Sequence, residues 1–231
     1  GIVKQIADSV CVMEKGKIVE QNKTSKVFNE PQHLYTKKLI NSEPREKKIK
    51  SSQNEIILSV KNLSVFYKNS SKVIFGNNDD NFQAVKNLDF DIFKGDTLGI
   101  VGESGSGKTS VAQALIKLIS SDGSILFKNE DISNLSEKNF RSYRKNIQII
   151  FQDPFASLSP RLTIQDIVSE GLQVHFKDKT KKEMIDLTKK IINDVGLDSS
   201  MLSRYPHEFS GGQRQRIGIA RALILNPELI I

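Results

Sequence analysis

Apolar and polar residues alternate along several short segments of the chain, as they do in strands with one buried face. The alternation is clearest over 84–92, and a polar stretch rich in Asn, Ser, Asp and Gly over 68–83 predicts a loop before it. We expect 97–101, which has no polar side chain except that of Thr97, to be a short buried strand. The same reasoning predicts strands over 56–60, 63–67, 125–127 and 147–151.

Helical spacing of apolar residues is clearest in the second half of the chain. Apolar residues recur every three or four positions over 181–195. Thr180 and Glu183 form a capping box at its start, and Gly196 suits its end. Further helices are predicted over 109–119 and 212–225. Strands before and after helices, with a helical insert over 163–204, indicate an α/β domain built on a largely parallel sheet.

The first 45 residues carry a separate pattern. They predict a short helix, a hairpin around the turn 14–16, and a second helix for which Thr24 is a candidate cap. The residues that follow are charged and polar, with almost no apolar side chain that could pack in a core. The segment 46–54 is therefore predicted to be a linker.

Composition indicates a folded chain in a reducing compartment. Hydrophobic residues make up 38% and charged residues 26% of the 231 positions, which is typical of globular proteins. The single cysteine, Cys11, excludes a disulfide framework or a cysteine metal cluster. No apolar run approaches the ~18 residues of a membrane span. The net charge of +7 comes from scattered lysines without interleaved aromatic residues, so nucleic acid is not an expected partner.

The strongest chemical signal is a glycine-rich loop between the predicted strand 97–101 and the helix after it. Residues 102–109 match the pattern G-x-x-x-x-G-K-[ST] at every fixed position. Glycines let the backbone curl around phosphates, Lys108 adds a positive charge, and the Thr109 hydroxyl is a ligand for Mg²⁺. The sequence therefore predicts ATP binding by Gly102, Glu103, Ser104, Gly105, Ser106, Gly107, Lys108, Thr109 and Ser110.

A second glycine motif lies about 110 residues later, at Ser210, Gly211, Gly212 and Gln213. Its serine hydroxyl, glutamine amide and helix N-terminus can all donate to phosphate oxygens. The alternative is that Ser210 only caps the following helix. Together, the two motifs resemble the ATP-binding cassette family of ABC transporters, with Phe209 where Leu is commoner. The resemblance implies the α/β fold of a P-loop nucleoside triphosphatase, with a mostly parallel sheet, an antiparallel β subdomain and a helical insert. In that family, the second motif closes on the γ-phosphate held by the opposite domain of a head-to-tail dimer.

The resemblance implies further site residues. Gln152, at the end of the predicted strand 147–151, is similar to the family glutamine that contacts Mg²⁺ and the attacking water and that senses the membrane partner. Gln152 and Lys108 are therefore the expected catalytic residues, and Thr109 and Gln152 the expected metal ligands. Tyr67 stands where the family places an aromatic residue that stacks on adenine, with Phe66 as a rival.

Two flanking segments narrow the resemblance to oligopeptide and dipeptide importers, of the type linked to peptide-antibiotic uptake. They are 151–161, where Ser159 departs from the usual Asn, and 204–209. Residues 1–22 and 31–37 resemble the tail of another such cassette. The implied domains are the tail of a first cassette over 1–45, the linker over 46–54, and a second cassette over 55–231.

The implied function is that of the ATP-binding subunit of a peptide importer, with ATP and Mg²⁺ as cofactors. The implied partners are transmembrane permease subunits, a second cassette and, indirectly, a peptide-binding protein, with the chain peripheral on the cytoplasmic face of the inner (plasma) membrane. A non-transport cassette protein or a nucleotide-binding remnant is the alternative.

The two ends of the sequence suggest an internal fragment. In the family, the strand that begins at 229–231 leads to the Walker B Asp and a Glu general base. We therefore expect the complete protein to be an ATP hydrolase. The 231 residues alone are expected to bind nucleotide, to turn it over negligibly and to be poorly soluble.

Overall fold

A computed structural model describes residues 2–42, 55–67, 82–153 and 157–231. The chain divides into two compact units, residues 1–50 and 51–231. The predicted linker 46–54 and most of the predicted loop 68–83 lie outside the described residues. None of the described helices combines the length and the apolar character needed to cross a membrane.

The first unit is a hairpin with three short helices, of which the sequence predicts the hairpin and the first two helices. Its elements are α1 (Ile2–Ile6), β1 (Ser9–Glu14), β2 (Lys17–Lys23), α2 (Thr24–Asn29) and α3 (Leu34–Asn41). Lys15 and Gly16 have φ values of 49° and 78°, which suit a tight hairpin turn. The Thr24 cap was predicted wrongly: Lys23 occupies the N-cap position of α2, its side chain makes no capping hydrogen bond, and the Thr24 hydroxyl donates to the carbonyl of Ala7 at 2.5 Å.

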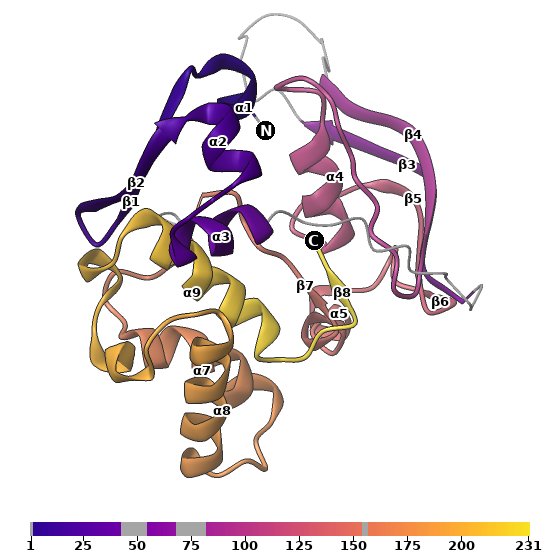
Figure 1. Ribbon diagram of the computed structural model, residues 1–231. Helices are drawn as coiled ribbons and strands as arrows, with labels where there is room; N and C mark the ends of the chain where they lie inside the picture. Colours follow the sequence, from indigo (N-terminus) through magenta and orange to yellow (C-terminus); the bar gives the residue numbers. More distant parts are fainter. Residues whose placement is uncertain (1, 43–54, 68–81, 154–156) are drawn as a thin grey trace, which may run out of the picture. The chain divides into compact units, whose positions relative to one another are not determined.

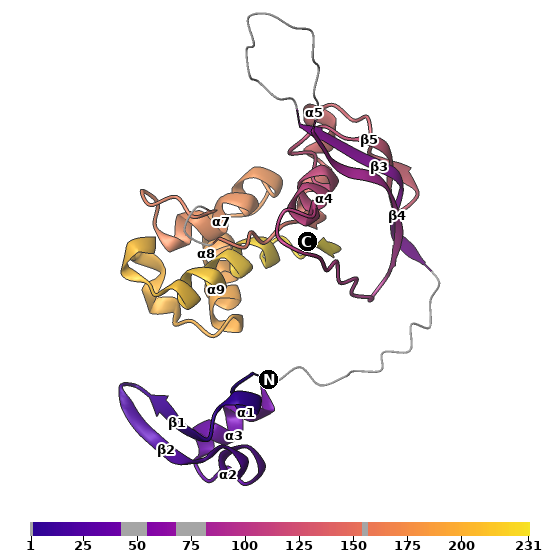
Figure 2. The same cartoon turned by 90° about the horizontal axis from the view of Figure 1, so that it is seen from above.

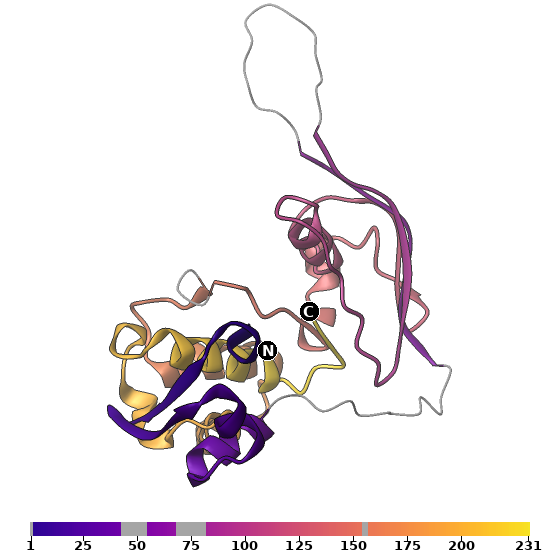
Figure 3. The same ribbon diagram turned by 45° about the horizontal axis from the view of Figure 1, so that its top comes forward.

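An antiparallel sheet forms one part of the second unit, with strand order β4-β3-β5-β6. The strands are β3 (Ile56–Tyr67), β4 (Phe82–Phe93), β5 (Asp122–Phe127) and β6 (Glu130–Asp131). The two predicted strands 56–60 and 63–67 are a single strand, in which Asn62 takes a positive φ of 52°. Figure 3 shows β3 and β4 running side by side.

Helix α4 (Lys108–Leu115) packs against the inner face of this sheet (Figure 2). Val111, Ala114 and Leu115 join Val65 and Val85 in the core. The helix is shorter than predicted because Lys117, just beyond it, takes a positive φ of 55°.

Parallel pairing is confined, within the described residues, to β7 (Ile147–Gln148) and β8 (Leu229–Ile230). One further pair of hydrogen bonds joins Ile231 to Ile150 and Gln148. The predicted strand 97–101 was wrong: the segment is irregular, and Val101 is 92% exposed. A strand needs a hydrogen-bonded neighbour, and no described strand pairs with this segment.

The remaining part of the second unit is helical (Figure 1). Short turns at α5 (Glu137–Phe140) and η1 (Tyr143–Lys145) precede β7. The main helices are α7 (Ile164–His175), α8 (Lys181–Asp194) and α9 (Gly211–Leu223), with 3₁₀ turns η2 (Ser199–Ser203) and η3 (Pro206–Glu208) between the last two. The predicted capping box of α8 is confirmed, because Thr180 and Glu183 each accept the other's backbone N–H. The helices share a second core that includes Val168, Ile192 and Ile217.

Candidate nucleotide site

The glycine-rich loop turns directly into α4, and Gly107 is the capping residue of that helix. Gly107 has a φ of 90°, which favours glycine. A Cβ atom at this position would also lie 2.4 Å from the carbonyl oxygen of Ala84 on β4. A glycine is therefore favoured at position 107 for two reasons: its backbone conformation and its close contact with β4.

The ammonium group of Lys108 folds back over the loop that precedes it. Its Nζ donates to the carbonyl oxygens of Gly102 at 2.7 Å and Glu103 at 2.5 Å, and to Ser106 Oγ at 3.2 Å. An ammonium has three protons, so these bonds use its full donor capacity. Ser104 lies in the exposed turn of the same loop. A phosphate that enters the loop must take over one or more of these hydrogen bonds.

Three of the predicted site residues line one pocket of about 560 Å³. Lys108 and Thr109 enter it from the start of α4, and Gln152 enters it from the segment after β7. Phe151, Asp153 and Ile231 are among the other lining residues. The structure thus brings the glycine-rich loop and the predicted catalytic glutamine to the same cavity, although 43 positions separate Thr109 from Gln152 in sequence.

Three of the other predicted residues of the loop line a smaller pocket of about 150 Å³, which Gly102, Glu103, Ser104 and Ser106 do not line. Tyr67 lines it together with Gly105, Gly107 and Ser110. The Tyr67 hydroxyl lies 3.0 Å from Ser110 Oγ. Between the two rival aromatics, Tyr67 therefore lies beside the loop, whereas Phe66 is absent from the pocket lining.

The second glycine motif begins α9. Ser210 caps the helix, and it forms a capping box with Gln213: Ser210 Oγ accepts from the Gln213 N–H at 3.3 Å, and Gln213 Oε1 accepts from the Ser210 N–H at 2.9 Å. The capping alternative is thus present in the structure, but it engages these two side chains only as acceptors. Within the part of the chain that the structure describes, the Ser210 hydroxyl proton and the Gln213 amide protons have no acceptor and can be donated to a ligand. Neither pocket beside the glycine-rich loop is lined by Ser210, Gly211, Gly212 or Gln213.

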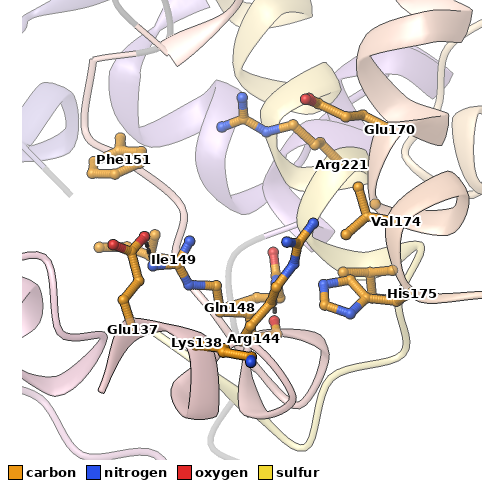
Figure 4. A pocket seen from close by; sticks show the side chains of 13 residues that line it. Glu137, Lys138, Arg144, Gln148, Ile149, Phe151, Glu170, Val174, His175 and Arg221 are labelled. Carbon is orange, nitrogen blue, oxygen red and sulfur yellow. Dashed lines mark hydrogen bonds and ion pairs between the residues drawn. The ribbon is translucent and has the colours of Figure 1, made fainter. Parts of the chain in front are cut away.

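Sequence reasoning missed a third pocket, of about 680 Å³, which Figure 4 shows. Its lining is rich in titratable groups from α5, η1, α7 and α9 and from the turn between the first two, namely Glu137, Lys138, Arg141, Arg144, Glu170, His175 and Arg221. Burial lowers the pKa of the His175 imidazole, and the nearby positive charges of Arg141, Lys145 and Arg144 lower it further. The sequence feature from which this pocket could have been predicted is the group of basic residues within 141–145.

The third pocket and the 560 Å³ pocket share a wall. Ile149 and Phe151 line both of them. The three residues that lead from β7 to Gln152 therefore separate the cavity beside Lys108 from the charged cavity.

A family model described as ABC transporter matches residues 85–231. The peptidoglycan transport ATP-binding protein YejF of Agrobacterium fabrum is 41% identical over 236 residues, covering 100% of this chain and 42% of its own length. The oligopeptide transport ATP-binding protein OppF of Bacillus subtilis is 51% identical over 151 residues, covering 64% of this chain and 50% of its own length. The chain thus spans half or less of the length of these relatives.

Solved structures of ATP-binding cassettes have a similar fold. The dimeric, post-hydrolysis structure of the cassette MJ0796 bound to ADP and Pi aligns with a TM-score of 0.66 at 27% identity, over 75% of this chain and 72% of that one. The cassette cbiO1 of Clostridium perfringens aligns with a TM-score of 0.60 at 28% identity, over 76% of this chain and 64% of that one. The α/β fold of a P-loop nucleoside triphosphatase is confirmed by these neighbours.

Proposed function

Because the chain belongs to the ABC transporter family of ATP-binding proteins, we propose that it is part of the ATP-binding subunit of a peptide importer. The observation that carries the proposal is the pocket in which Lys108, Thr109 and Gln152 meet. The ammonium of Lys108, the hydroxyl of Thr109 and the side-chain amide of Gln152 belong to residues that line one cavity. This donor set suits the triphosphate of ATP and an accompanying divalent cation.

Nucleotide binding begins with an exchange of hydrogen bonds at Lys108. The ammonium leaves the carbonyl oxygens of Gly102 and Glu103 and donates to phosphate oxygens instead. The exchange is favourable because hydrogen bonds between two charged groups are stronger than those to neutral carbonyls. The backbone N–H groups at the start of α4 add the positive end of the helix dipole.

Mg²⁺ fits the oxygen donors that Thr109 and Gln152 bring to the pocket. We assign the Thr109 hydroxyl and the Gln152 side-chain oxygen as its protein ligands, which leaves its remaining positions to phosphate and water. When bound, the cation neutralises phosphate charge and favours attack by water. Gln152 orients the incoming water by its amide group.

The second glycine motif serves a neighbouring cassette. Its free donors at Ser210 and Gln213, with the backbone of Gly211 and Gly212, would meet the γ-phosphate held by the opposite domain of a head-to-tail dimer. Support comes from the dimeric state of the similar cassette bound to ADP and Pi, and from the position of the motif outside both pockets beside its own loop. ATP hydrolysis is thus assigned to the complete, dimeric protein.

Peptide import is supported by the names of the relatives. Besides the peptidoglycan and oligopeptide transport proteins, the glutathione import ATP-binding protein GsiA of Escherichia coli O157:H7 is 39% identical over 259 residues, covering 100% of this chain and 41% of its own length. We accordingly propose transmembrane permease subunits and a peptide-binding protein as partners, and a peripheral position on the cytoplasmic face of the membrane. Residues 1–45 are proposed to be the tail of a preceding cassette, since relatives such as YejF and GsiA match the chain over its whole length.

Calorimetric titration of the chain with ATP and Mg²⁺ tests the proposed site. Lys108→Ala should weaken ATP binding about 10- to 100-fold, because a hydrogen bond to a charged group contributes about 1.5–3 kcal/mol. Lys189→Ala, which removes an exposed lysine from α8, is the matched control and should bind like the parent chain. Equal affinities for all three proteins would refute the proposal.

A further inference from the structure

Two aromatic side chains face each other where β3 ends and β4 begins. Tyr67 and Phe82 are direct partners across the two strands. They are 39% and 60% exposed, so a large part of both rings is uncovered. Directly opposed residues on an antiparallel pair project to the same face and lie close enough to interact.

A β-bulge sets the face on which Phe82 lies. Val65 pairs with Val85, but the next residue of β3, Phe66, pairs with Gln83. Ala84 is therefore an extra residue on β4. Without the bulge, the side chains of Phe82 and Val85 would project from opposite faces of the sheet, because side chains alternate along a strand and the two residues are three positions apart. The extra residue reverses the alternation, and Phe82 returns to the face of the buried Val85.

The same bulge fixes this end of the sheet against the glycine-rich loop. The Ala84 carbonyl oxygen occupies the position next to Gly107 that a side chain would need. The two rings and the loop consequently line one pocket, formed by Tyr67, Phe82, Ala84, Gly105, Gly107, Lys108, Thr109 and Ser110. One side of the pocket presents aromatic surface and the other presents phosphate-binding backbone. A nucleotide matches this arrangement, because it carries an aromatic base at one end and phosphates at the other.

We propose that Phe82 is a second aromatic contact for the base of the bound nucleotide, so that Tyr67 and Phe82 hold the base as a cross-strand pair. The inference rests on the proposed function, because it requires the triphosphate to occupy the glycine-rich loop. Phe82 has no polar atom, so it contributes apolar stacking and no hydrogen-bond readout. The ligand class is therefore purine nucleoside triphosphates in general, whose larger rings stack better than those of pyrimidines.

Binding of ATP and of inorganic tripolyphosphate to the 231-residue chain separates the base from the phosphates. Phe82→Ala should weaken ATP binding about 5- to 100-fold, which is the range for loss of one base–aromatic stack, and should leave tripolyphosphate binding unchanged. The matched control is Phe66→Ala: Phe66 is adjacent to Tyr67, is 43% exposed and does not line the pocket. This control should bind both probes like the parent chain.

A fluorescent variant reports the contact directly. The sequence contains no tryptophan, so Phe82→Trp introduces a single indole. ATP and GTP should quench its emission through stacking, CTP should do so less, and tripolyphosphate should not.

The possible outcomes distinguish this inference from the function on which it rests. If the parent chain binds neither ATP nor tripolyphosphate, the proposed site itself fails, and the inference fails with it. If the parent chain binds both and Phe82→Ala binds ATP equally well, only the inference is overturned. The inference is also overturned if Phe82→Ala loses both probes alike, if Phe66→Ala loses ATP to the same extent, or if ATP binds Phe82→Trp without quenching.

Discussion

The guanidinium of Arg221 donates a hydrogen bond from Nη1 to the backbone carbonyl of Ser157. Arg221 lies near the end of α9, the helix that begins with the second glycine motif, and Ser157 lines the pocket that contains Lys108 and Gln152. Burial lowers the pKa of Arg221, and the charge of Glu170 opposes that effect. One helix therefore carries the proposed dimer contact at its start and supports the wall of the nucleotide pocket at its end.

Replacement of Arg221 by alanine should destabilise the helical part of the second unit. The substitution leaves a backbone carbonyl without this charged donor, a loss of about 1.5–3 kcal/mol in the free energy of unfolding. Urea unfolding followed by circular dichroism measures the change. Gln215→Ala, at an exposed position of the same helix, is the control and should stay within about 0.5 kcal/mol of the parent chain. Indistinguishable unfolding of the two variants would show that the Arg221 hydrogen bond contributes nothing.

Two glycines of the loop offer a test of the contact between the loop and the sheet. Gly105 and Gly107 have similar φ values of 83° and 90°, but only the second would bring a Cβ atom against a neighbour. Gly105→Ala should cost about 1–2 kcal/mol of stability from the backbone conformation alone. Gly107→Ala should cost more and should also weaken ATP binding, since the loop must move away from Ala84. Equal costs in urea unfolding would contradict the predicted role of this contact.

The sequence predicted well those elements that depend only on residues close together in the chain, such as helix caps. The predicted capping box of Thr180 and Glu183 depends on residues three positions apart, and it is present. The Ser210 cap, which the sequence offered as the alternative to ligand binding, is also present and belongs to a capping box with Gln213. The failure at 97–101 has a different origin: whether an apolar run becomes a strand depends on a hydrogen-bonding neighbour distant in sequence. Similarly, the family resemblance implied an adenine contact for Tyr67, but nothing in the sequence pointed to Phe82. The bulge that turns Phe82 to that face is a property of strand register.

The pair formed by Glu228 and Lys128 predicts a pH dependence of stability. Lys128 Nζ lies 2.7 Å from Glu228 Oε2, and Asn146 donates to the other carboxylate oxygen at 2.5 Å. The hydrogen bond from Lys128, and to a smaller extent that from Asn146, lowers the pKa of Glu228 from its usual value. A carboxyl group whose pKa is lower in the folded state stabilises the fold above its unfolded pKa. This stabilisation is lost as the pH falls through the folded value.

Urea unfolding at pH 7 and at pH 3 should therefore show a smaller loss of stability on acidification for Glu228→Gln than for the parent chain. Asp186→Asn, which neutralises an exposed carboxylate on α8, should retain the loss shown by the parent chain. An unchanged acid dependence in Glu228→Gln would exclude Glu228 as a contributor.

The proposed Mg²⁺ ligands can be separated from the phosphate ligands by the way ATP affinity depends on the cation. ATP should bind the parent chain more tightly with Mg²⁺ than with EDTA, because the cation links the phosphates to the Thr109 hydroxyl. Thr109→Ser keeps the hydroxyl and should keep this gain, whereas Thr109→Ala and Gln152→Ala should each reduce it. Lys108→Ala should instead weaken binding under both conditions, since its charge acts on the phosphates themselves. If Thr109→Ala shows the same gain from Mg²⁺ as Thr109→Ser, Thr109 is not a ligand of the cation. The assignment would then rest on Gln152, the other proposed ligand in the pocket.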